Sequence, residues 1–353
     1  MERSFKNKER GQRLGWLDFG KAAGILVVLF VHAECRLGPL TFYGGMFYMP
    51  VFFVAAGYTY RCQKEQPFWQ FLKRKAVRLL VPYGGSSVFL WLFFWLKDSL
   101  LAGNPADWKL SSLFGILYSR NQMYTSAFSG ENPVLLDLLN APLWFLTAIF
   151  LTYVWYEFIS RSGRKYVLLG LGLLFSVIWH QATPLLLPWS LDAVPYFACF
   201  FAAGEWLREW KKEELLGEVW FLALLLVSFL LSSRLNKSVN LSCGDYGQSM
   251  LLGLVPGITG SLLVFAAGMC LEKKCPPVMK AISKAGQETM TVLCFHMFVF
   301  MFIRTGAAVL GFREGITKAV LVLGSLVLLT GGGILIRRLR GRACSGADDR
   351  KEG

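Results

Sequence analysis

The amino-acid sequence predicts an all-α, polytopic membrane protein in which about ten transmembrane helices form one bundle. Two observations predict this fold class. Of the 353 residues, 54% are hydrophobic, and they gather in long apolar runs separated by short basic segments. The mean hydropathy of the chain is +0.45. A soluble domain of this size does not need so many runs that are long enough to cross a bilayer.

The apolar runs occupy nearly the whole chain and leave no room for a separate soluble domain. We therefore expect one membrane domain over residues 15–336, a basic segment over residues 1–14, and a charged, disordered tail over residues 337–353. The ten predicted spans, in chain order, cover residues 15–35, 44–60, 79–97, 142–160, 166–182, 190–208, 217–233, 250–271, 287–303 and 317–336.

The first span follows a basic stretch, as the apolar region of a signal peptide does. Its end, Val31 to Cys35, lacks the small-residue pattern of a cleavage site. We therefore expect an uncleaved membrane helix.

The longest segment between spans covers residues 98–141 and lies between the third and fourth spans. Asn-Pro and Ala-Pro turn signals surround a more apolar stretch, Leu110 to Tyr118. Two interpretations remain open. The segment either folds over the mouth of the bundle and contacts a substrate, or forms a surface connection.

The chain carries 37 Lys and Arg residues against 23 Asp and Glu. About 27 of the basic residues fall in the tails and even-numbered loops, against about nine in the odd-numbered loops. This bias predicts cytoplasmic N- and C-termini and contact with membrane lipids, and it explains the basic charge without a nucleic acid. The eight cysteines are scattered without a pair or a His/Cys cluster at metal-ligand spacing, so we expect no metal site.

The first span contains two ionisable residues on one helical stripe. Lys21 precedes His32 by eleven residues. In a helix, their side chains then point in directions that differ by about 20° around the axis and lie about 16 Å apart along it. Buried ionisable groups in a membrane are costly and therefore functional candidates. Two structural alternatives remain: Lys21 extends to the lipid headgroups, and His32 is a hydrogen-bonded core residue.

Several motifs resemble the membrane-bound acyltransferase family 3, a group of polysaccharide O-acetyltransferases. Trp16 to Asp18, followed by Lys21, Gly24 and His32, resembles the opening of the family's first helix. There an Arg or Lys is followed, after ten intervening residues, by His. The second span, Phe47 to Tyr58, resembles the family's F-H-M-P-x-F-F-x-x-S-G-Y stretch.

The resemblance extends over nearly the whole chain, with departures. In the second motif Tyr48 replaces the usual His and Ala56 the usual Ser. The family's R-x-x-R motif has its counterpart in Lys75 and Arg78, with Lys in the first place. Two further stretches are similar to the fucose 4-O-acetylase-like branch of the family: Pro142–Leu146 and Leu187–Asp192.

The resemblance implies a multi-pass acyltransferase that lies in a cell membrane, either a bacterial inner membrane or a plasma membrane. Such an enzyme transfers an acyl group, usually acetyl from acetyl-CoA, to a hydroxyl of a glycan or a lipid-linked glycan. Acetyl-CoA is then a co-substrate, and no bound cofactor is implied.

Acyl transfer to a sugar hydroxyl needs a base, because an alcohol is a poor nucleophile at neutral pH, and an imidazole suits this task. We expect His32 to act with Lys21 as the catalytic pair, either as general base or as a nucleophile that forms an acyl-imidazole. His296, which resembles a position of the family, is expected either to pack its helix or to support His32. Asp18 is expected to hold the Lys21 ammonium in an i, i+3 ion pair.

The phosphates of coenzyme A call for cations on the inner side of the membrane. Lys75, Arg78 and Arg74 are expected to bind them, with Arg78 more important than Lys75 because a guanidinium binds phosphate at two points. The alternative is that this basic run only anchors the topology.

Aromatic planes and a carboxylate suit a sugar, so Trp144, Trp189 and Asp192 are expected to contact the acceptor, with Tyr58 in support. The alternatives are interfacial belt residues and, for Asp192, a helix cap.

Two other function classes compete with the enzyme. One is a transporter or flippase of a glycan or lipid-linked intermediate, and the other is an assembly scaffold without chemistry. No internal repeat with matching broken helices is visible, which counts against a secondary transporter.

Overall fold

The computed structural model describes residues 13–101, 110–124, 126, 133–136 and 139–348. The long helices follow in the order α2 (Gly15–His32), α3 (Pro39–Phe47), α4 (Pro50–Thr59), α5 (Phe68–Leu101), α6 (Leu110–Tyr118), α7 (Trp144–Arg161), α8 (Lys165–Ala182), α9 (Val194–Glu209), α10 (Val219–Asn236), α11 (Met250–Lys274), α12 (Pro276–Gln287), α13 (Thr289–Val309) and α14 (Glu314–Asp348). Short elements connect them: β1 (Gln122–Met123), β2 (Val134–Leu135), η2 (Ala141–Leu143), η3 (Pro188–Ser190), η4 (Lys212–Gly217) and η5 (Leu241–Cys243). Strands β1 and β2 pair antiparallel.

The predicted helical membrane architecture is confirmed. Within the described ranges, nine helical segments are long and apolar enough to cross a membrane: Gly15–His32, Pro39–Thr59, Phe68–Leu100, Ala141–Arg161, Lys165–Ala182, Val219–Asn236, Met250–Lys274, Thr289–Val309 and Glu314–Leu339. Helix α9, at the predicted sixth span, has 16 residues and is shorter than these nine. The expected disordered tail is wrong for its first part, because α14 continues past Arg337 to Asp348.

The second span is broken into two helices at Pro50. Proline has no backbone N–H, so it cannot continue the hydrogen bonding of α3, but it is well suited to the first turn of α4. The break leaves Tyr48 and Met49 at the joint, close to α2, where a Cβ on Gly24 would lie 3.0 Å from the Tyr48 carbonyl oxygen. Gly24 therefore permits the close approach that places this joint in the interior.

Helices α4 and α9 pack backbone to backbone in the centre of the bundle. Gly57 lies against the Phe201 backbone and Gly204 against the Val54 backbone, and a Cβ on either glycine would overlap the facing chain. Around this contact the core is aromatic, with Phe53 stacked on Phe197 at 4.8 Å between ring centroids. The tight contact anchors the helices that surround the interior cavities.

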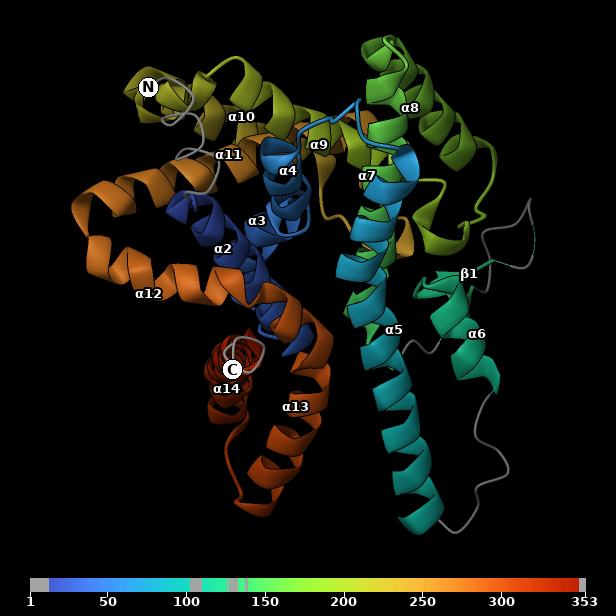
Figure 1. Ribbon diagram of the computed structural model, residues 1–353, viewed down its shortest axis with the longest axis vertical. Coiled ribbons are helices and arrows are strands. Elements are labelled where there is room, and N and C mark those ends of the chain that lie inside the picture. Colours follow the sequence, from blue (N-terminus) through green and yellow to red (C-terminus); the bar gives the residue numbers. More distant parts are fainter. Residues whose placement is uncertain (1–12, 102–109, 125, 127–132, 137–138, 349–353) are drawn as a thin grey trace.

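Other helices lie at the periphery. In Figure 1, α13 and α14 form a pair below α2, and α5 extends on the other side of α13 from α14, with α6 to its right. Large apolar side chains on α8, α10 and α14 are exposed, among them Leu171, Leu231 and Val327. In a membrane these faces contact lipid, while α2, α4, α7 and α9 supply most of the core.

Candidate functional site

Two cavities lie inside the bundle, one beside each half of α2. The first has a volume of about 360 Å³ and is lined by Lys21, Lys75 and Arg78; we call it the lysine cavity. The second has a volume of about 560 Å³ and is lined by His32 and Trp144; we call it the histidine cavity. Both volumes fall in the range of small-molecule sites.

The lysine cavity gathers positive charge from two helices that are distant in sequence. Lys21 of α2 lies 2.5 Å from the Asp18 carboxylate, so the expected i, i+3 ion pair is present. Lys75 of α5 places its Nζ 3.4 Å from the centre of the Tyr153 ring. The described residues that line the cavity include three cations and no carboxylate. This lining suits an anionic ligand.

Arg74 differs from its two basic neighbours. Its side chain is exposed and does not line the lysine cavity. Arg78, one turn later, does line it. The structure therefore brings Lys75 and Arg78 together with Lys21 but does not bring Arg74 to them.

The histidine cavity is lined by polar groups that the sequence analysis did not select. Asn121 enters from the segment between the third and fourth spans, so the described residues around it reach this end of the bundle. Tyr118 of the same segment donates a hydrogen bond from its hydroxyl to the Leu186 carbonyl, which holds α6 against the bundle. No local pattern around Asn121 marks it in the sequence. The polar lining residues besides His32 are Arg36, Thr41, Tyr48, Asn121, Ser238, Asn240 and Ser242.

The two cavities adjoin. Met49, at the joint between α3 and α4, and Leu293 of α13 line both of them. The helical stripe that carries Lys21 and His32 therefore passes two compartments with a common apolar wall. Since Met49 is unbranched and flexible, this wall has a component that can move.

His296 of α13 lies beside His32. The two ring centroids are 5.2 Å apart, and the ring planes are inclined by 54°. His296 is fully buried, and its Nδ1 lies 2.9 Å from the Val292 carbonyl oxygen. The supporting residue expected from the sequence is therefore adjacent to the expected catalytic imidazole.

Trp189 and Asp192 do not line either cavity, so their expected contact with an acceptor has no support in the geometry. The Trp189 indole N–H donates to the Leu117 carbonyl at 2.7 Å. Asp192 is fully buried and accepts from Arg120 at 2.6 Å, from the Leu187 backbone N–H at 2.9 Å, and faces His180 Nε2 at 3.0 Å.

Burial and neighbouring groups shift the pKa of Asp192 in opposite directions. Burial alone would raise the pKa of Asp192, but the hydrogen bond from His180 and the charge of Arg120 outweigh it and lower the pKa below its usual value. This ion pair ties the segment after α6 to the segment before α9. It therefore holds the chain next to Asn121, which lines the histidine cavity.

Tyr58 also lies outside both cavities. Its hydroxyl donates a hydrogen bond to Glu213, and its ring packs edge-on against Trp16 at 4.9 Å between centroids. Tyr58 therefore fastens the end of α4 to η4.

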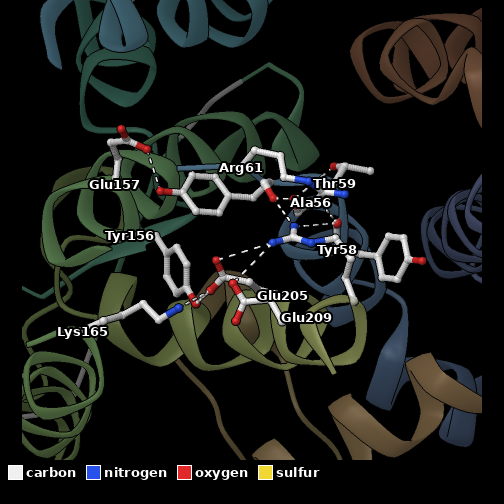
Figure 2. Close-up of polar contacts among 11 residues, drawn as sticks. Ala56, Tyr58, Thr59, Arg61, Tyr156, Glu157, Lys165, Glu205 and Glu209 are labelled. Atoms are coloured by element: carbon white, nitrogen blue, oxygen red, sulfur yellow. Dashed lines mark hydrogen bonds and ion pairs between the residues drawn. The ribbon is translucent and has the colours of Figure 1, made fainter. Parts of the chain in front are cut away.

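Two buried carboxylates near the end of α4 escaped the sequence analysis. The first, Glu157 of α7, accepts from the Tyr60 hydroxyl at 2.6 Å and from Arg161 at 2.7 Å. Burial, together with this hydrogen bond to Glu157, raises the pKa of Tyr60. Figure 2 shows Glu157 beside the turn that carries Tyr58, Thr59 and Arg61.

The second carboxylate is Glu205 of α9. It accepts from the Tyr156 hydroxyl at 2.5 Å and from the Lys165 ammonium at 2.7 Å, as Figure 2 shows. Arg208 of the same helix donates to the Tyr58 carbonyl oxygen at 3.0 Å. Arg208 also lies 3.8 Å from Glu205, so the two carboxylates, one through Tyr60 and one through Arg208, hold the C-terminal end of α4, where Thr59 lines the lysine cavity. The signal that could have revealed them is an isolated acid within an apolar run.

The described residues contain no group of three or more His, Cys, Asp or Glu that could hold a metal ion. The cavities offer cations, the His32 imidazole and hydroxyl or amide groups, which suit anion binding and proton transfer.

A family model described as acyltransferase domain, that of acyltransferase family 3, matches residues 14–338. This range contains both cavities and all residues that line them. No curated protein and no solved structure matches the chain.

Proposed function

The chain belongs to acyltransferase family 3, and from this membership we propose that it moves an acetyl group from cytoplasmic acetyl-CoA to a hydroxyl of a cell-surface glycan or its precursor. The observation that supports this proposal best is the pair of adjoining cavities, one cationic and one holding an imidazole. They provide separate places for an anionic donor and a polar acceptor with a common wall between them.

The donor is proposed to bind in the lysine cavity. Coenzyme A carries several phosphate charges, and Lys21, Lys75 and Arg78 are the cations that line this cavity. The guanidinium of Arg78 can bind one phosphate with two parallel hydrogen bonds, whereas the ammonium groups act as point charges. The thioester end of the donor then points toward Met49 and Leu293.

The chemistry is proposed to take place beside His32. The imidazole accepts the proton of the acceptor hydroxyl as its oxygen attacks the thioester carbonyl. The carbon–sulfur bond breaks, the acyl group becomes an ester of the acceptor, and the coenzyme A thiolate leaves with the proton that His32 returns. In the alternative route, His32 itself attacks the thioester and transfers the acyl group in a second step.

The acceptor is proposed to occupy the histidine cavity. Trp144 offers an aromatic plane to a sugar ring, and Tyr48 and Asn121 offer hydrogen-bonding groups on the same lining. A lipid-linked glycan fits the location within a membrane domain equally well.

The orientation follows from the donor. Acetyl-CoA is cytoplasmic, so the beginning of α2 is proposed to face the cytoplasm together with both termini, and His32 to lie nearer the outer face. This agrees with the excess of Lys and Arg in the tails and even-numbered loops. The acyl group then crosses the bundle while coenzyme A stays inside.

The test uses membranes that contain the protein and acetyl-CoA labelled in the acetyl group, with the glycan fraction of the native host as acceptor. Label is expected in glycan with the wild type and not with His32→Ala, whereas Lys73→Gln, at an exposed residue that lines neither cavity, is expected to transfer normally. A transporter would move the glycan without labelling it. Equal labelling by His32→Ala at an equal membrane level would refute the proposed site.

A further inference from the structure

The hydrogen bonding of His296 determines its tautomer. Its Nδ1 lies 2.9 Å from the Val292 carbonyl oxygen, one turn earlier in α13. A carbonyl oxygen only accepts, so Nδ1 carries the hydrogen of this bond. In the neutral ring the lone pair then belongs to Nε2.

That lone pair has no partner within the described part of the chain. His296 is fully buried, and its Nε2 makes no hydrogen bond there. A buried polar atom without a partner is costly and calls for an explanation. The rings of Phe300 and His32 lie close to that of His296, with centroids 5.7 and 5.2 Å away. The Phe300 ring has no hydrogen-bond donor, whereas the His32 ring carries an N–H.

We propose that His296 is a positioning residue for the reaction, whose Nε2 accepts a hydrogen bond from the ring N–H of His32. This bond fixes one tautomer of His32, so that the lone pair of its other ring nitrogen faces the acceptor hydroxyl. The inference rests on the proposed function and adds the means by which the base is oriented. During the reaction His32 takes the hydroxyl proton and passes it to the coenzyme A thiolate, and His296 keeps its own proton on Nδ1 throughout.

The surroundings of the pair favour an imidazole in this role. A carboxylate commonly orients a catalytic histidine, but the described lining of the histidine cavity contains none, and Arg36 is its charged residue. Glu34, close to His32 in sequence, is exposed and paired with Arg304 at 3.3 Å. Arg304 also donates to the His32 backbone carbonyl at 3.5 Å. Among these neighbours, His296 combines a ring in contact with that of His32 and a buried nitrogen without a partner in the described part of the chain.

The chain offers a direct spectroscopic test because it has only three histidines. The His180→Gln variant, labelled with ¹⁵N in histidine and placed in lipid nanodiscs, retains His32 and His296 alone. Proton–nitrogen correlation spectra are expected to show His296 as the Nδ1–H tautomer and His32 as a single tautomer. Adding His296→Phe, which keeps an aromatic ring but removes the acceptor, is expected to convert His32 to a mixture of tautomers.

Unchanged His32 nitrogen shifts after His296→Phe, or an Nε2–H tautomer of His296, would overturn the inference. These outcomes do not depend on catalysis. They therefore differ from a failure of the proposed function, in which the wild type transfers no label although the two histidines are coupled.

Kinetics supply the second measurement. His296→Phe is expected to lower kcat about 10- to 100-fold while leaving the KM for acetyl-CoA unchanged, by analogy with the loss of a partner that orients a metal-bound histidine. His296→Gln places an amide oxygen near the same position and is expected to recover much of this loss. Equal kcat values for the Phe and Gln variants, at equal folded levels, would indicate a packing role and contradict the inference.

Discussion

Replacing Arg78 with Gln is the sharpest test of the donor site. The guanidinium lines the lysine cavity, but its side chain is exposed, so solvent screens its charge. Two unit charges 4 Å apart interact by about 1 kcal/mol in water and by about 4 kcal/mol at an effective dielectric constant of 20. For a partly screened phosphate contact we expect a loss of about 1–2 kcal/mol, which weakens coenzyme A binding about 5- to 30-fold.

The assay is calorimetric titration of coenzyme A into the purified protein in nanodiscs. Lys73→Gln is the matched control, since Lys73 lies five residues earlier on the same helix, is exposed, and does not line the cavity. Arg78→Lys should bind with intermediate affinity because it keeps the charge but not the planar fork. Raising the salt concentration should weaken wild-type binding more than binding by Arg78→Gln. Equal affinities of the Arg78→Gln and Lys73→Gln variants would refute the assignment of the donor to this cavity.

Three further predictions follow from packing and charge. Gly57→Ala should lower the free energy of unfolding by about 1–3 kcal/mol, because its Cβ would overlap the Phe201 backbone. Thermal unfolding in detergent measures this change. Gly170→Ala is the control, because a Cβ at Gly170 would meet no atom within 4 Å. Asp192→Asn leaves the buried Arg120 charge unpaired and should cost about 3–5 kcal/mol. The pKa of Asp192 is lower in the folded than in the unfolded protein, so its ionised form stabilises the fold fully above the unfolded pKa of about 4 and no longer does so once the pH falls below the folded pKa. The melting temperature of the wild type should therefore fall in this acidic range. Asp192→Asn should lack this fall. Trp144→Ala should raise the KM for the acceptor while coenzyme A binding, measured by the same titration, stays unchanged; weakened coenzyme A binding would mean that the bundle itself is disturbed.

Hydropathy predicted the helices well because a membrane span is specified locally, by length and by the exclusion of charge. The joint at Tyr48 and Met49 follows from Pro50, another local signal. The tail was harder to predict. A charged segment lacks the apolar stripe that marks a helix, yet α14 extends through it to Asp348.

Helical spacing could group the candidate residues only where they share one helix, and the nearness of His296 and Trp144 to His32 lay beyond it. Lys21 with Asp18, and Lys75 with Arg78, follow from helical spacing, and the structure brings these residues to the same cavity or ion pair. Asn121 and Arg120 enter from a segment whose position depends on contacts with Leu186 and Asp192, more than 60 residues later in the chain. Such contacts are set by tertiary packing and leave no periodic signal in a single sequence.

Helix α13 connects the two features on which the proposed reaction depends. Leu293 forms part of the wall between the cavities, and His296 lies almost one turn further along, beside His32. The buried amide of Asn140, just before η2, donates to the Leu293 and Cys294 carbonyls at 3.3 and 2.6 Å. Because these bonds hold α13 at the height of the wall, they fix the backbone of Leu293 and the start of the turn that carries His296. On the α13 side, movement of the wall to admit a thioester is therefore expected to come from the Leu293 side chain and not from the backbone that leads to His296.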